Sequence, residues 1–141
     1  MRSWQAVGQQ KFLVEDDVVH WEVCGNISAR ELTTIFEEGV HIQNARGYAL
    51  FCINISGDWS FPLEARRALA QFHRTHTAVG ATAIVGISAN KALFIDLVLR
   101  GIAKVSGHRP NTRFFGAMQE AAVWLDDARV QLHERLRTQK Q

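Results

Sequence analysis

The chain has 141 residues, the size of one ordinary domain with a single hydrophobic core. Hydrophobic residues make up 47% of it and charged residues 21%, close to the averages of globular proteins, which excludes collagen-like, disordered and coiled-coil classes. The formal net charge of +2 is too small to indicate nucleic-acid binding. Composition thus limits the class of protein, and function has to be inferred from motifs.

The charge is unevenly distributed along the chain. Residues 1–70 contain six basic and nine acidic side chains, whereas residues 71–141 contain ten and five. The two cysteines, Cys24 and Cys52, are too few for a disulfide framework and lie in apolar stretches typical of buried thiols. The N-terminal residues lack the apolar run of a signal peptide, and no apolar run is long enough to cross a membrane. We therefore expect a cytoplasmic protein without a transmembrane segment or a nucleic-acid partner.

Two short strands and a helix are predicted in the first third of the chain. Residues 10–15 and 18–24 alternate between apolar and polar side chains around an acidic turn, which indicates a β-hairpin. Ser28 and Glu31 then have the spacing of a capping box. A helix is therefore expected to begin at Ser28 and to end at Gly47.

The rest of the chain alternates strands and helices. Nearly continuous apolar runs predict buried strands at residues 48–55 and 81–87, and a shorter strand is expected at 112–115. Three helices follow these strands in turn. The first is expected to be capped by Ser60 or Phe61 and to end at Gly80, the second to run from a cap at residue 88 or 90 to about residue 105, and the last to begin near residue 116.

The resulting element order is β-β-α-β-α-β-α-β-α. Strands that are separated by helices require right-handed crossovers and a mostly parallel sheet, so only the N-terminal hairpin is expected to be antiparallel. The sequence therefore predicts an α/β fold with a central, mostly parallel β-sheet and about four helices. We expect a single domain over residues 1–134 and a polar C-terminal tail over residues 135–141.

Three segments of the sequence resemble the STAS domain, named after sulphate transporters and anti-sigma factor antagonists. They are the strand sequences 48–57 and 82–86 and the closing segment Arg113-Phe-Phe-Gly-Ala-Met-Gln-Glu-Ala-Ala-Val-Trp-Leu125. The likeness covers residues 10–127 and is greatest to the bacterial SpoIIAA-like branch, which is itself similar to SEC14-type lipid-binding folds. The resemblance implies a STAS-like regulatory domain that works by reversible protein association.

The phosphorylation switch of the anti-sigma factor antagonists is not matched in this sequence. In that group an Asp-Ser pair lies at the start of the second helix, and phosphorylation of the serine adds about two negative charges that can turn binding off. An ungapped comparison puts Pro62 and Leu63 at the two positions, and Ser60 lies two or three residues earlier. We therefore expect a domain without the usual switch, in which Ser60 is either a helix cap or a substitute phosphorylation site.

No motif indicates catalysis, a metal or a cofactor. A phosphate-binding glycine loop is absent. His73 and His76 have a spacing compatible with two metal ligands, and Cys52 could be a third, but the paired motifs of known metal sites are missing. The carboxylate pairs lie in turns or on solvated helix faces, so acid–base catalysis has no anchored site. We expect no enzymatic activity and neither a metal nor a cofactor.

The helix predicted near residues 88–105 is apolar nearly all round, so a single buried stripe does not account for its composition. A homodimer interface, a groove for a partner or a cavity for an apolar ligand would each explain the excess, and so would cover by the last helix and the tail. We assign to this apolar interface or ligand site the residues Phe94, Leu97, Val98 and Ile102.

The loop before the second helix is the other candidate surface. Trp59 and Phe61 bring large apolar area with few rotatable bonds, which suits a binding anchor, although Trp59 could instead fold onto the sheet edge as a lid. We assign to partner binding the residues Asp58, Trp59, Ser60, Phe61, Arg66 and Arg67. The predicted function is a non-catalytic regulatory or scaffold domain that binds a protein partner, and the alternative is a carrier of a small apolar ligand or lipid.

Overall fold

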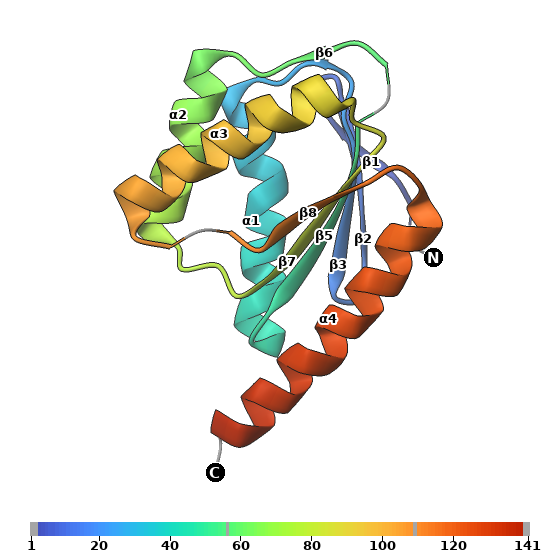
Figure 1. Ribbon diagram of the computed structural model, residues 1–141, viewed down its shortest axis with the longest axis vertical. Coiled ribbons are helices and arrows are strands. Elements are labelled where there is room, and N and C mark those ends of the chain that lie inside the picture. The colour runs from blue at the N-terminus through green and yellow to red at the C-terminus, as the bar shows by residue number, and fades with distance from the viewer. Residues whose placement is uncertain (1–2, 56, 109, 140–141) are drawn as a thin grey trace.

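A six-stranded, mostly parallel sheet is the centre of the computed structural model, which describes residues 3–55, 57–108 and 110–139. The strand order is β1-β2-β3-β5-β7-β8, and the four strands from β3 to β8 run parallel while β1 and β2 are antiparallel additions at one edge (Figure 1). The strands are β1 (Gln5–Val7), β2 (Gln10–Glu15), β3 (Val18–Glu22), β5 (Ala49–Asn54), β7 (Gly80–Val85) and β8 (Thr112–Phe115). The predicted mostly parallel sheet with an antiparallel N-terminal hairpin is confirmed.

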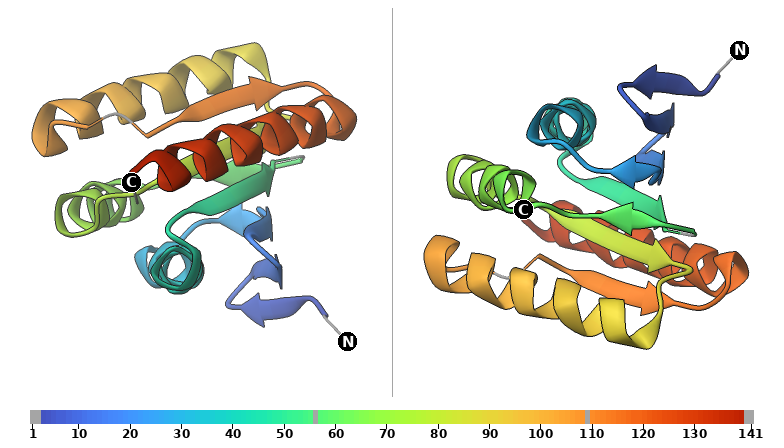
Figure 2. Two further views of the ribbon diagram at one scale, coloured as in Figure 1. Left: turned by 90° about the horizontal axis from the view of Figure 1, so that it is seen from below. Right: turned by 90° about the horizontal axis from the view of Figure 1, so that it is seen from above.

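Four helices in the described residues cover the two faces of this sheet. They are α1 (Ala29–Arg46), α2 (Leu63–Thr75), α3 (Ala89–Ser106) and α4 (Met118–Gln139). Helices α1, α2 and α3 lie next to one another on one face, and α4 crosses the other face beside β7 and β8 (Figure 2). The predicted α/β class is therefore confirmed. None of the described helices is long and apolar enough to span a membrane.

The capping box predicted at the start of α1 is present. Ser28 accepts a hydrogen bond from the backbone N–H of Glu31 at 3.1 Å, and the Glu31 carboxylate accepts one from the backbone N–H of Ser28 at 2.8 Å. The same carboxylate also accepts the backbone N–H of Gln9 at 2.6 Å, from the turn between β1 and β2. The cap therefore holds the N-terminal edge of the sheet as well as the helix, and Gly47 ends α1 in the left-handed conformation as expected.

Strand alternation divides the core into two layers. On β5, Phe51 and Ile53 point toward α1, α2 and α3, whereas Leu50 and Cys52 point toward α4. The last two residues of β8 divide in the same way, because Phe114 packs with the first layer and Phe115 with the second. The two faces are therefore packed independently, and a hollow in one layer does not require a hollow in the other.

The start of α2 differs from the prediction. Its N-cap is Pro62, which makes no side-chain capping bond, and Ser60 lies before the helix in a two-stranded parallel ladder between β4 (Gly25–Asn26) and β6 (Trp59–Ser60). The Ser60 hydroxyl donates to the side chain of Asn26 at 2.7 Å. Because this ladder holds the chain extended, neither Ser60 nor Phe61 is in a position to cap the helix.

The other differences lie at element ends. Helix α2 ends at Thr75 and is capped by His76, and Gly80 begins β7 instead of terminating the helix. Any side chain at residue 80 would place its Cβ 1.8 Å from the Ala49 carbonyl oxygen, so the glycine serves the close strand approach. Helix α4 continues through Gln139 into the stretch expected as a polar tail, where Leu136 packs beside Gly47.

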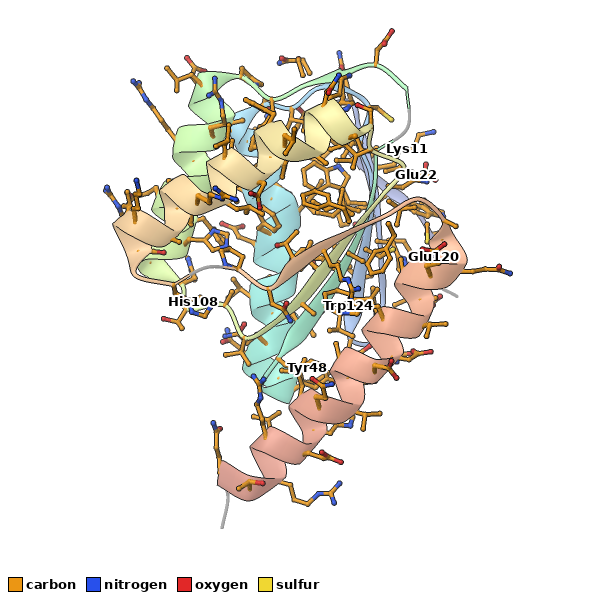
Figure 3. The ribbon with its side chains drawn as sticks, in the orientation of Figure 1. Lys11, Glu22, Tyr48, His108, Glu120 and Trp124 are labelled. Atoms are coloured by element: carbon orange, nitrogen blue, oxygen red, sulfur yellow. The ribbon has the colours of Figure 1, made fainter. Side chains whose placement is uncertain are left out.

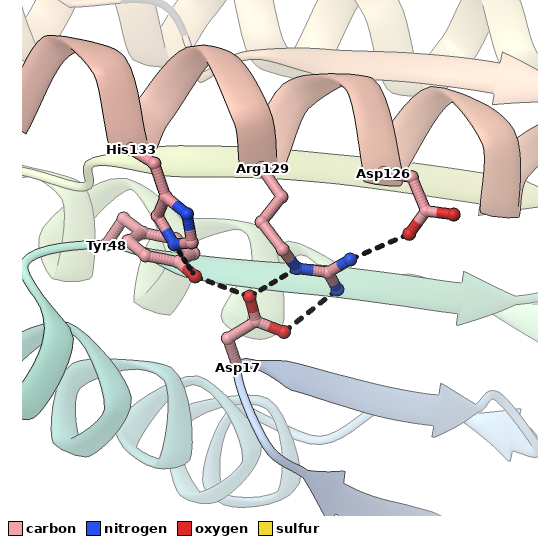
Figure 4. Close-up of polar contacts among 5 residues, drawn as sticks. All are labelled: Asp17, Tyr48, Asp126, Arg129 and His133. Carbon is pink, nitrogen blue, oxygen red and sulfur yellow. Dashed lines mark hydrogen bonds and ion pairs between the residues drawn. The ribbon is translucent and has the colours of Figure 1, made fainter.

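A polar network around the buried Asp17 carboxylate joins α4 to the sheet (Figure 4). Arg129 donates two hydrogen bonds to the Asp17 carboxylate, from Nε at 2.6 Å and from Nη2 at 2.9 Å, and a third from Nη1 to Asp126 at 2.7 Å. The Tyr48 hydroxyl donates to Asp17 Oδ2 at 2.5 Å and lies 2.8 Å from Nε2 of His133. Since the hydroxyl hydrogen goes to Asp17, Nε2 of His133 is the donor in the second contact.

The charges in this network support each other. Burial alone would raise the pKa of Asp17, but the hydrogen bonds from Arg129 and Tyr48 outweigh burial and hold that pKa below its ordinary value. Burial and the adjacent Asp17 carboxylate raise the pKa of Tyr48 to about 12. Asp17 is therefore ionised and Tyr48 protonated near neutral pH, which is the state that the bidentate contact with Arg129 requires.

Candidate ligand cavity

A large hollow lies between the sheet and the three helices on its first face. Its volume is about 710 Å³, within the range of about 300–1,000 Å³ that is usual for small-molecule sites. Strands β3, β5 and β7 form its floor and α1, α2 and α3 form its walls, and the lining also includes Ala128, Gln131, Leu132 and Arg135 of α4. The apolar part of the lining is large and includes Trp21, Ile27, Leu32, Phe36, Phe51, Ile53, Ile55, Trp59, Phe61, Leu69, Phe72, Ile84, Ile95 and Leu99.

Aromatic side chains shape this cavity. Phe36 of α1 contacts Phe51 edge-on with ring centroids 5.0 Å apart and Phe72 of α2 at 5.7 Å. Phe51 reaches this position because Gly39 of α1 carries no side chain, and a Cβ there would lie 2.3 Å from the Phe51 ring. All three phenylalanines keep partial exposure, although Phe36 and Phe51 pack against the core layer. Their exposed surface faces the hollow, which is therefore lined by aromatic faces.

The cavity cannot be an empty void. At about 24 cal/mol per Å³, a sealed apolar void of this size would cost on the order of 17 kcal/mol, more than the entire stability of an ordinary domain of about 5–15 kcal/mol. The hollow must therefore be filled through an opening, by solvent or by a ligand. Because its walls are mostly apolar, a molecule that buries apolar surface fills it more favourably than water does.

The end of the cavity near β6 is closed by residues that the sequence indicated as partner anchors. Trp59 and Phe61 are half-buried, pack against the core and line the cavity wall. Trp59 is held by the β4–β6 ladder and has the Lys91 ammonium 5.2 Å from its ring centroid. Arg66 donates from Nε to the Phe61 carbonyl at 3.2 Å. The structure thus directs both aromatic side chains inward.

The other residues assigned to partner binding do not share this inward position. Asp58 and Arg67 are exposed, and Ser60 is exposed and bonded to Asn26. The Arg66 guanidinium lies 5.5 Å from the ring centroid of Phe94 on α3. The set therefore divides into two cavity-lining aromatics, an arginine between α2 and α3, and three exposed polar residues.

The apolar set assigned to the third helix divides as well. Ile102 is only 2% exposed and belongs to the core, so it is not part of an outward surface. Leu97 is 64% exposed and Phe94 38%, and Val98 is partly buried against the core. Leu93, at 66%, extends the exposed row on α3. The residues of α3 that do line the cavity, Ile95 and Leu99, are different ones.

The opposite end of the cavity is polar and exposed. It is formed at the C-terminal ends of α1, α2 and α3, where Gln43 binds the loop after α2 by donating to the Thr77 carbonyl at 2.8 Å and accepting the Val79 N–H at 2.9 Å. Figure 3 shows His108 just beyond the end of α3, beside the end of α2. The polar lining at this end comprises Gln43, Asn44, His73, His76, Thr77, His108, Asn111, Gln131 and Arg135.

His73 and His76 both use Nδ1 for contacts within their own chain segment. Nδ1 of His73 lies 3.0 Å from the Leu69 carbonyl, which only accepts, so this Nδ1 carries a hydrogen. Nδ1 of His76 lies 2.9 Å from the Thr75 hydroxyl and 3.2 Å from the Phe72 carbonyl. In both residues Nε2 is left for another partner. Burial lowers the pKa of His73, and the neighbouring His108 and His76 lower it further against the raising effect of the Leu69 hydrogen bond. The three histidines thus lie close enough to influence one another.

These histidines do not form a metal site with Cys52. Cys52 points to the opposite face of the sheet, where its thiol lies 3.5 Å from the sulfur of Met118, while His73 lies among α1 and α2. Burial raises the pKa of Cys52, so its thiol stays protonated. Among the described residues, no group of three or more histidine, cysteine, aspartate or glutamate side chains is arranged to hold a metal ion.

Several residues of the site and of its support carry no recognisable sequence signal. The phenylalanines that shape the cavity have the spacing of ordinary core residues, so the pattern predicts burial and not a hollow. Asp17 and Arg129 are separated by 112 positions, and no local motif connects them. The one available signal at the rim was the pair His73 and His76 on a single helix.

Comparisons with protein-family models, with curated proteins and with solved structures gave no match. The candidate site therefore rests on the geometry of the cavity and on the chemistry of its lining.

Proposed function

We propose that this protein binds a small apolar molecule in the cavity between the sheet and α1, α2 and α3. The observation that carries the proposal is the hollow of about 710 Å³ lined by aromatic and aliphatic side chains in a layer that would otherwise be close-packed. The sequence alternative of a carrier for an apolar ligand or lipid agrees with this geometry. The resemblance to a SpoIIAA-like domain with SEC14-type relatives supports the same proposal.

A neutral fluorescent probe tests the proposal directly. N-phenyl-1-naphthylamine gains fluorescence in apolar surroundings and is expected to bind saturably at one site per chain. Leu99→Trp places an indole into the hollow, and it should lower probe affinity by about tenfold because the added ring occupies ligand volume. Native mass spectrometry of the purified protein provides a second readout, in which a retained apolar molecule is expected.

Leu97→Trp is the matched control, because Leu97 lies on the outer side of the same helix. It should leave probe binding unchanged. Ala49→Leu adds a smaller side chain to the cavity from β5 and should also weaken probe binding. It provides a second test in case Leu99→Trp does not fold. Absence of saturable binding in the wild type, or equal binding by both tryptophan variants and Ala49→Leu, would contradict the proposal.

A second candidate function is protein association through the outer face of α3. Leu93 and Leu97 are about two-thirds exposed there, and Val105 is 49% exposed. Three large apolar residues on one face of a helix form the kind of patch that marks an interaction surface. The resemblance to the STAS domain, whose members act by association, supports this candidate, with a second copy of the chain as the first partner to test.

Light scattering measures this association. We expect a dimer that Leu97→Glu converts to a monomer, because a buried unpaired carboxylate disfavours an apolar interface. Val130→Glu on α4, which also changes an exposed apolar residue to glutamate, should leave the mass unchanged. A wild-type monomer at high concentration would exclude the homodimer.

A further inference from the structure

The ionisable side chains of the described cavity lining are all basic. Among the described lining residues they are His73, His76, His108 and Arg135, and no aspartate or glutamate is among them. His73, His76 and His108 lie close enough to one another to affect the pKa of His73, and Arg135 of α4 lines the same cavity. Trp59 and Phe61, which pack against the core, line the end near β6. The cavity is therefore apolar at its closed end and basic at its mouth.

The histidines at the mouth keep a hydrogen-bonding atom for a ligand. His73 uses Nδ1 to donate to the Leu69 carbonyl, and His76 uses Nδ1 for the Thr75 hydroxyl and the Phe72 carbonyl, so Nε2 of each is left for a ligand. His76 is held by stacking on Phe72, with ring centroids 4.4 Å apart, and Phe72 itself lines the apolar part. One helix thus connects the apolar wall to the polar mouth.

Charge at the mouth favours an anion. Arg135 of α4 brings a cationic guanidinium group to the lining, and an anion beside a histidine favours the charged form of the imidazole. Neutral amides complete the mouth, at Gln43 of α1 and at Gln131 of α4. Glu134 lines a separate groove that shares Gln131 and Arg135 with the cavity, but it does not line the cavity itself.

We propose that the ligand is an amphiphile with an apolar chain and an anionic head group, a carboxylate or a phosphate. The chain lies among Phe36, Phe51 and Leu99, and the head group lies at the mouth against His76, His108 and Arg135. This inference rests on the proposed function, since it specifies the chemical class of the molecule that the apolar cavity takes.

Displacement of N-phenyl-1-naphthylamine by ligands of equal chain length tests the inference. Dodecanoate and dodecyl phosphate represent the two anionic head groups, dodecanol the neutral one and dodecylamine the cationic one. We expect at least one anion to bind about tenfold more tightly than the alcohol, because a charge-assisted hydrogen bond is about twice as strong as a neutral one. The stronger of the two anions identifies the head group.

Variants locate the preference at the mouth. His108→Gln combined with Arg135→Gln should remove the preference for the anion while leaving binding of the neutral probe intact. His41→Gln and Arg137→Gln combined form the control, since both residues are exposed and lie outside the cavity lining. If dodecanol binds as tightly as both anions, or the amine binds best, the inference is wrong although probe binding still supports an apolar site. Loss of probe binding itself contradicts the proposed function.

Discussion

The contact between Asp17 and Arg129 makes a quantitative prediction about how α4 is held. Arg129→Met keeps most of the apolar stem but removes three hydrogen bonds, two of them to a carboxylate whose side chain is 5% exposed. Breaking a fully buried ion pair costs about 3–5 kcal/mol, and an exposed pair is worth about 0–1 kcal/mol. Because the Arg129 side chain is 31% exposed and Tyr48 still donates to Asp17, we expect a loss of about 2–3 kcal/mol in the free energy of unfolding.

Urea unfolding followed by circular dichroism measures this loss. Arg137→Met, on an exposed position of the same helix, should stay within about 0.5 kcal/mol of the wild type. Adding Asp17→Asn to Arg129→Met should cost less than the two single changes together, because no unpaired charge is left in the double variant. A wild-type stability for Arg129→Met, or strict additivity in the double variant, would show that the network does not hold α4.

Two further predictions concern pH and the cavity wall. The pKa of Asp17 is lower in the folded state than its ordinary value of 3.8. The contribution of ionised Asp17 to stability is therefore complete above pH 3.8 and is lost as the pH falls through the folded-state pKa. Asp17→Asn should flatten the dependence of the unfolding free energy on pH between pH 5 and pH 2, measured in urea titrations, and an unchanged slope would contradict the lowered pKa. Gly39→Ala should destabilise the protein by about 1–3 kcal/mol, because the added Cβ would meet the Phe51 ring. Gly101→Ala on α3, where an added Cβ has nothing within 4 Å, should stabilise it by about 0.5–1 kcal/mol. Equal effects of the two changes in thermal unfolding would refute the close approach of α1 to β5.

Local chemistry made the fold predictable from the sequence. The capping box of α1 and the left-handed glycine after it fix both helix ends through contacts between near neighbours in sequence. Strands β2 and β8 lie at the predicted residues because turn signals bound their apolar alternation. Where the prediction was wrong, at the start of α2, the deciding interaction is a ladder between β4 and β6, whose residues are more than 30 positions apart. Such pairing has no local signature.

The cavity could not be predicted for a related reason. A phenylalanine that lines a hollow and one that fills a core have the same spacing and the same neighbours in sequence. What separates them is the distance between elements, and this depends on the glycine at 39 and on the course of α3, which packs mainly against α2. The sequence therefore predicted that the third helix has more apolar residues than one buried stripe needs. It did not show which of them face the cavity and which face outward.

Helix α3 is the element at which the two proposed functions meet. Its composition, apolar nearly all round, is explained by two separate faces: Ile95 and Leu99 toward the cavity, and Leu93 and Leu97 toward the outside. A ligand in the cavity contacts the inner face and replaces solvent there, so it stabilises the position of the helix that presents the outer face. Ligand binding and association are therefore not exclusive alternatives for this helix. If both occur, thermodynamic linkage requires that a dimer of the outer face and a ligand of the inner face change each other's affinity by the same factor.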